Sequence, residues 1–129
     1  MNTTAKKNDD KVKVVFLKTP KDPYCPSEVM AFFPDMDWNI DGTMKGCYVH
    51  NGQHGPCQEL YALQDCKPAK EKDYAALRRE LVTQVGYTLV VLDAKVWQKS
   101  NGQRKKELQQ IDRDNFTMGK LDNGGAKAA

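Results

Sequence analysis

The sequence predicts an α+β protein in which a mostly antiparallel sheet of about five strands packs against one helix. Three features support this class: short segments rich in β-branched and aromatic residues, proline- and glycine-containing turns between them, and one amphipathic helix within residues 70–87. The expected order of elements is β-β-β-β-α-β. We therefore expect a single α+β domain.

The first expected strand, KVKVVFLK at residues 11–18, is apolar on both faces. Alternation places three apolar residues on one face and two on the other: Val12, Val14 and Phe16 against Val15 and Leu17. Such a strand is expected to be covered by other elements on both sides of the sheet.

The other four expected strands lie between turn residues. They span residues 28–33, 45–50, 58–65 and 88–97. Pro34 closes the first of these because proline lacks a backbone N–H. Segment 58–65 is ambiguous between a strand and a helical turn, and we favour a strand because Tyr61 and Leu63 alternate with polar neighbours.

The expected helix carries one apolar stripe. Tyr74, Leu77, Leu81 and Val85 recur at spacings of three and four residues. Gly86 follows them, where a left-handed residue commonly ends a helix. This helix is expected to pack its stripe on the sheet.

The chain divides by composition into three parts. Residues 1–10 are polar and are expected to be a flexible N-terminus, and residues 11–97 hold the α+β domain. Residues 98–129 are rich in Gln, Lys, Asn and Gly, and we expect a mobile basic tail without an apolar face wide enough to dock.

Charge and hydropathy exclude several classes of protein. Residues 1–98 hold 13 Lys plus Arg and 13 Asp plus Glu, whereas residues 99–129 hold 7 and 4. Because residues 1–98 carry no net charge, we do not expect a dedicated nucleic-acid binder. Weak binding of nucleic acid through the basic residues 99–129 stays possible. No signal-peptide core and no segment near 18 apolar residues is present, so we expect a cytoplasmic protein without a membrane partner and with reduced cysteines.

The segment GCYVHNGQHGPC at residues 46–57 concentrates the chemically active side chains. Cys47, His50, His54 and Cys57 have the spacing C-x2-H-x3-H-x2-C, which supplies four ligand types that zinc accepts. If residues 45–50 are extended, however, Cys47 and His50 point to opposite faces of the sheet. We therefore favour a core cysteine with turn histidines and expect no cofactor, with zinc as the alternative.

A second motif, DWNIDG at residues 37–42, matches the start of a calcium-binding loop. Its twelfth position is Tyr48 where calcium needs a bidentate glutamate, and a strand follows where the motif needs a helix. A hairpin turn rich in Asn and Asp explains these residues better.

Three hypotheses for the function use the same region or the tail. The favoured one is a binding module that is not an enzyme. Its ligand-binding residues lie at a hairpin tip and comprise Tyr48, His50, Asn51, Gln53 and His54. A small metal-dependent or Cys/His hydrolase using the same cluster is the alternative, and a structural or packaging role with the tail touching nucleic acid is the third.

The chain resembles a group of small uncharacterised proteins from tailed bacteriophages and bacterial mobile elements. The resemblance covers about residues 11–95 and rests on a Phe-Pro strand end, a Cys-Tyr-x-His-x-Gly-Gln-His-Gly segment, Lys-Pro-Ala, a Tyr-containing helix and a Gly-Tyr strand. The matching residues are Phe33, Pro34, Cys47, Tyr48, His50, Gly52, Gln53, His54, Gly55, Lys67, Pro68, Ala69, Tyr74, Gly86 and Tyr87. It implies a phage or mobile-element origin and action in a bacterial host, on a host protein or a nucleotide-like small molecule, and it brings no established activity. The group's pattern does not require a cysteine at Cys57.

Overall fold

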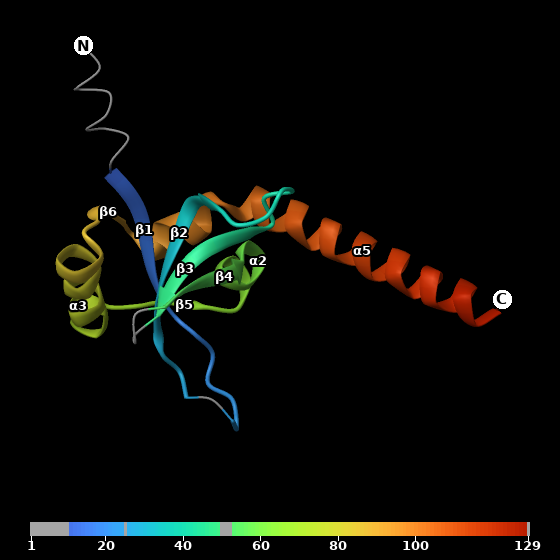
Figure 1. Ribbon diagram of the computed structural model, residues 1–129, viewed down its shortest axis with the longest axis horizontal. Helices are drawn as coiled ribbons and strands as arrows, with labels where there is room; N and C mark the ends of the chain where they lie inside the picture. Colours follow the sequence, from blue (N-terminus) through green and yellow to red (C-terminus); the bar gives the residue numbers. More distant parts are fainter. Residues whose placement is uncertain (1–10, 25, 50–52, 129) are drawn as a thin grey trace, which may run out of the picture.

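The computed structural model describes residues 11–24, 26–49 and 53–128 and confirms the α+β class. A mixed sheet lies between two layers of helices (Figure 1). Its strands are β1 (Lys11–Lys18), β2 (Val29–Asp37), β3 (Met44–Val49), β4 (Gln53–Gln58), β5 (Lys67–Pro68) and β6 (Thr88–Leu92). The helices are α2 (Glu59–Gln64), α3 (Glu71–Glu80) with its π-helical continuation η1 (Leu81–Val85), α4 (Ala94–Ser100) and α5 (Gly102–Ala128).

The sheet is mostly antiparallel, as expected. Its hydrogen-bonded order is β4-β3-β2-β1-β5, and β6 also pairs with β1. β5 pairs with Leu17 and Lys18, whereas β6 runs parallel to residues 11–15, so the two strands share one edge of β1. The β1–β6 pair is the parallel one, and the other pairings are antiparallel.

Two cores cover the two faces of the sheet, which confirms the interpretation of β1 as a strand with two apolar faces. The α4-side core contains Val15, Leu17, Met30, Phe32, Cys47, Cys57, Ala62, Leu63, Cys66, Ala94, Trp97 and Leu108. The α3-side core contains Val14, Phe16, Ala31, Phe33, Tyr48, Leu77 and Leu81. The sheet is thus the middle layer of three.

The predicted helix forms, but its last turn changes geometry. Tyr74, Leu77 and Leu81 pack on the sheet, and Gly86 takes the expected left-handed conformation with φ 92°. The amide of Gly86 donates to the Leu81 carbonyl five residues earlier, at 3.0 Å, as a π-helical turn requires. This widened turn shifts the helical phase, so Val85 is 36% exposed instead of completing the stripe.

Strand β2 continues beyond the expected stop at Pro34. The register between β2 and β3 shifts between Phe33 and Asp37, so the strand passes Pro34 at an irregularity in the ladder. Proline is tolerated where the ladder is irregular because its missing N–H breaks no regular hydrogen bond there.

The expectation of a strand at residues 58–65 is wrong, because α2 occupies Glu59–Gln64. Three of its residues are buried at helical spacing: Glu59, Ala62 and Leu63. Glu59 is charged, so a search for regularly spaced apolar residues does not count it, and the helical spacing of the three buried residues goes unnoticed.

The last expected strand is too long at its C-terminal end. β6 ends at Leu92, and Asp93 then caps α4 by accepting a hydrogen bond from the amide of Val96 at 2.9 Å. Aspartate at this position satisfies a free amide of the first helical turn and so favours a helix over a continued strand.

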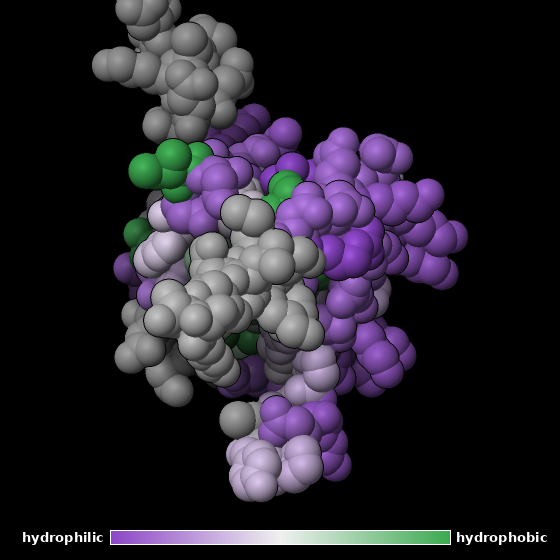
Figure 2. All heavy atoms as spheres, turned by 90° about the vertical axis from the view of Figure 1, so that its right-hand side faces the viewer, coloured by the Kyte–Doolittle hydropathy of each residue, from purple (hydrophilic) through white to green (hydrophobic). Residues whose placement is uncertain are grey.

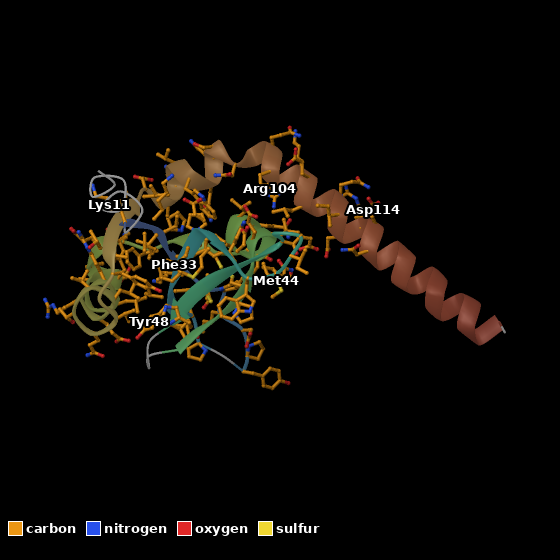
Figure 3. All side chains as sticks on the ribbon, turned by 45° about the horizontal axis from the view of Figure 1, so that its top comes forward. Lys11, Phe33, Met44, Tyr48, Arg104 and Asp114 are labelled. Atoms are coloured by element: carbon orange, nitrogen blue, oxygen red, sulfur yellow. The ribbon has the colours of Figure 1, made fainter. Side chains whose placement is uncertain are left out.

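The expectation that residues from 98 onward do not dock is also wrong. The Leu108 side chain is 3% exposed in the α4-side core, and Arg104 on α5 bonds Glu59 on α2. Beyond Asp114 the helix runs on past the rest of the fold (Figures 1 and 3). The first turns of α5 therefore belong to the packed structure.

The outer surface on the side of α5 is polar. Seen from the C-terminal end of α5, the coloured residues are mostly hydrophilic, with a few hydrophobic spots (Figure 2). Of the helices in the described part of the chain, none is both long and apolar enough to cross a membrane.

Candidate functional site

The β3–β4 hairpin separates the candidate residues onto the two faces of the sheet. Tyr48 lies opposite His54, and Cys47 lies opposite Gly55. Neighbouring residues of a strand point to opposite faces, so Tyr48 and His54 share the α3 side while Cys47 faces the α4 side. Tyr48 and Phe33 both lie between the strands and α3 in Figure 3.

His54 is exposed, yet it is held by several contacts. Its Nε2 atom lies 2.9 Å from the Tyr87 hydroxyl, with which it forms a hydrogen bond. The imidazole ring centroid is 4.8 Å from that of Tyr48 and 5.9 Å from that of Tyr87, both edge to face, and it stacks on Phe33 at 6.2 Å. These contacts fix the ring of an exposed side chain.

Tyr48 is the buried member of the same group. Its ring is 2% exposed, and its hydroxyl donates a hydrogen bond to the Glu80 carboxylate at the end of α3. This bond to a negatively charged acceptor, together with burial, raises the pKa of Tyr48 to about 12. The hydroxyl is therefore protonated at neutral pH, where it can donate a hydrogen bond but not accept a proton as a base.

We call Tyr48, His54, Glu80 and Tyr87 the His54 cluster. Tyr48 and His54 were predicted as site residues from the sequence, whereas Glu80 and Tyr87, which lie more than 30 residues further along the chain, were not. The conformation of Gly86 turns the chain so that Tyr87 follows η1 onto the sheet. The Gly-Tyr pair after the helix was the available signal, but nothing local indicated its partner.

The other predicted ligand-binding residues are placed only in part. His50 and Asn51 lie outside the described residues, and Gln53 is described only as the first residue of β4. His54 belongs to β4 itself and not to the hairpin tip where we expected it. The site therefore lies on the side of the hairpin that faces α3.

The cysteines form a separate group in the α4-side core. Cys47, Cys57 and Cys66 are free thiols with 8%, 7% and 5% exposure. A hydrogen bond from Cys57 lowers the pKa of Cys47, whereas the same interaction and then burial raise the pKa of Cys57. Burial is the main cause that raises the pKa of Cys66 to about 11. These thiols are packed side chains, as the favoured interpretation of Cys47 expected.

The proposed four-ligand zinc site is not supported by this arrangement. Cys47 and Cys57 face the α4 side of the sheet, while His54 faces the α3 side. The fourth candidate, His50, lies outside the described residues. Among the residues that the structure does describe, no group of three or more His, Cys, Asp or Glu side chains is placed to hold a metal ion.

The DWNIDG segment is a hairpin turn, as predicted. The Asn39 side chain accepts a hydrogen bond from the Met44 amide at 3.0 Å, and the Asp41 carboxylate accepts from the Thr43 amide at 3.0 Å and the Thr43 hydroxyl at 2.7 Å. Hydrogen bonds from Thr43 lower the pKa of Asp41. Gly42 supplies the positive φ of 74° at the bend.

Comparison of the chain with protein-family models, curated proteins and solved structures gives no match. The resemblance to phage and mobile-element proteins therefore stays a prediction from the sequence.

Proposed function

We propose that this protein is a non-enzymatic binding module of a phage or mobile element, and that it binds a host protein in the bacterial cytoplasm through the His54 cluster. The observation that supports this most directly is the exposed imidazole of His54, fixed by the Tyr87 hydroxyl and by aromatic rings. A fixed polar group loses little conformational entropy when it contacts a partner, so more of the contact energy contributes to affinity.

Two observations favour binding over the alternative of hydrolysis. A Cys/His hydrolase needs a thiol within hydrogen-bond reach of an imidazole, but the sheet separates His54, the one candidate histidine within the described residues, from Cys47 and Cys57. The hydroxyl of Tyr48 donates its hydrogen bond to Glu80 and remains protonated at neutral pH. The cluster thus offers hydrogen-bond donors and acceptors without an activated nucleophile.

A protein partner fits the surroundings of the cluster better than a nucleotide-like ligand. Residues 1–98 carry balanced charge, so the domain offers no excess of positive charge for phosphate groups. Tyr87, which is partly exposed beside His54, is a residue type that protein interfaces favour.

The test compares partners captured from a bacterial lysate by the wild-type protein, His54→Ala, Tyr87→Phe and Lys67→Ala. Lys67 is an exposed residue of β5 and serves as the control. We expect a stoichiometric protein that the wild type and Lys67→Ala retain, and that His54→Ala and Tyr87→Phe lose. Equal capture by all four proteins would contradict the proposal.

Two further measurements separate the alternatives. ATP and GTP are titrated against the wild type by calorimetry, and saturable binding that His54→Ala abolishes would replace the host protein with a nucleotide as the ligand. His54→Ala should lower the free energy of unfolding by only about 1 kcal/mol, because one exposed hydrogen bond is lost. A much larger loss would show that His54 is mainly a packing residue and would overturn the site.

A further inference from the structure

Strand β6 has one hydrogen-bonded edge and one edge that no described strand occupies. It pairs in parallel with β1 from Lys11↔Thr88 to Val15↔Leu92, and β1 lies on one side of it only. All five of its residues are at least partly exposed, whereas four residues of β1 are buried. The outer edge of β6 thus presents backbone donors and acceptors at the surface.

The other two outer strands carry residues that discourage pairing with a further strand. β4 contains His54 and Pro56, and β5 consists of Lys67 and Pro68. Charged residues and proline at sheet edges disfavour the addition of a strand, because proline lacks an N–H and charge resists burial. β6 has the sequence TLVVL and contains neither.

Val90, at the centre of β6, is an apolar residue exposed at the surface. The Val90 side chain is 37% exposed. Alternation puts it on the same face as Leu92, which packs against the α4-side core. Val90 therefore lies at the margin of a packed core with no described neighbour that fully covers it.

We propose that a second copy of this chain pairs with β6, so that two sheets join into one through antiparallel β6 strands related by a two-fold axis at Val90. This pairing puts Val90 opposite its own copy, Leu89 opposite Val91 and Thr88 opposite Leu92. β6 contains no charged residue, so no charges meet in this pairing. Three of the five positions pair two apolar side chains, and the other two pair Leu92 with Thr88. The sequence is therefore complementary to itself under the symmetry that most homodimers use.

This interface lies beside the His54 cluster but uses other residues. Tyr87 of the cluster directly precedes β6, whereas His54 lies on β4, which is separated from β1 and β6 by β3 and β2. A dimer joined through β6 would carry two copies of the cluster, one on each half of a continuous sheet.

The test is sedimentation velocity of the full chain from about 1 to 200 µM, with the variants Val90→Lys, Val90→Glu and Ile111→Lys. Ile111 lies on α5 and is 36% exposed, so it receives the same substitution at matched exposure. We expect the wild type and Ile111→Lys to reach twice the monomer mass of 14.6 kDa. Val90→Lys should weaken dimerisation on the order of 100-fold, because two like charges meet at the axis.

A mixture of Val90→Lys and Val90→Glu should restore the dimer, since opposite charges then face each other. A wild type that stays monomeric at every concentration would overturn the proposal, as would a Val90→Lys variant that dimerises like the wild type. Should the Val90 variants fail to fold, hydrogen exchange of the wild type decides. Protection of the amides of residues 88–92 that rises with protein concentration supports the dimer, and protection that is independent of concentration refutes it.

Discussion

Replacing Arg104 with methionine should destabilise the protein by leaving the buried Glu59 carboxylate on α2 without its charged partner. The Glu59 carboxylate is 8% exposed and accepts hydrogen bonds from Arg104 Nε at 3.2 Å and Nη2 at 3.0 Å. Arg104 Nη2 also reaches the Gly42 carbonyl at 3.3 Å. The guanidinium thus joins α5 to α2 and to the β2–β3 turn, and methionine keeps its aliphatic stem but none of these bonds.

The expected loss follows from the burial of the two partners. Removing one partner of a fully buried ion pair costs about 3 to 5 kcal/mol, because the other charge stays in a medium of low polarity. The Arg104 side chain is 34% exposed, so water can partly replace it, and we expect about 2 to 3 kcal/mol. Chains of this size are stable by about 5 to 15 kcal/mol, so the variant should still fold.

The assay is urea unfolding followed by circular dichroism for Arg104→Met, Glu59→Gln and the double variant. The double variant should lose less stability than the sum of the two single losses, because it leaves no unpaired charge. Arg113→Met is the control, since Arg113 bonds only its neighbour Gln110 among the contacts described for it. Additive losses, or an Arg104→Met loss no larger than that of the control, would refute the reasoning.

Four further predictions concern the packing of Gly46, the turn at Gly86 and the thiol of Cys66. Gly46→Ala should cost about 0.5 to 1.5 kcal/mol in urea unfolding, because the added methyl group would overlap the Met36 side chain and force this flexible residue out of its rotamer; the loss should shrink in a Met36→Ala background, and an equal loss in both backgrounds would contradict this. Gly86→Ala should cost about 1 kcal/mol from the positive φ of 92° alone, since its Cβ would meet open space, and unchanged stability would count against a strained turn. The Cys66 thiol should be alkylated by iodoacetamide about 100-fold more slowly at pH 8 than a thiol of pKa 9.0, as mass spectrometry can measure, because burial raises its pKa to about 11. Since this folded pKa exceeds the unfolded value, the neutral thiol stabilises the fold below pH 9 and that contribution disappears between about pH 9 and 11, so Cys66→Ala should reduce the alkaline loss of stability; an identical pH profile would refute it.

The sequence by itself determined the elements whose signals are local. Alternating apolar residues identified β1 with both of its faces, and the three- and four-residue spacing identified α3. Gly86 marked the end of the helix, and Asn and Asp side chains marked the turn before β3. Each of these features depends on residues within about one turn or one strand, where steric and hydrogen-bonding preferences act directly.

Only the tertiary structure decided where polar residues become part of the core. Glu59 hid the period of α2 because its burial depends on Arg104, which lies 45 residues away. The polar residues around Leu108 likewise gave no indication that α5 packs against the core, because the core residues that Leu108 joins lie far from it in the sequence. No short segment contains both members of such a pair.

The candidate site divides in the same way. The spacing of residues 47–57 brought cysteines and histidines together in sequence, but strand alternation sends Cys47 and His54 to opposite faces. Tyr87 and Glu80 join His54 and Tyr48 only because η1 ends over the sheet. Sequence determines which side chains are available, whereas their meeting depends on strand register and helix placement, which are set by long-range packing.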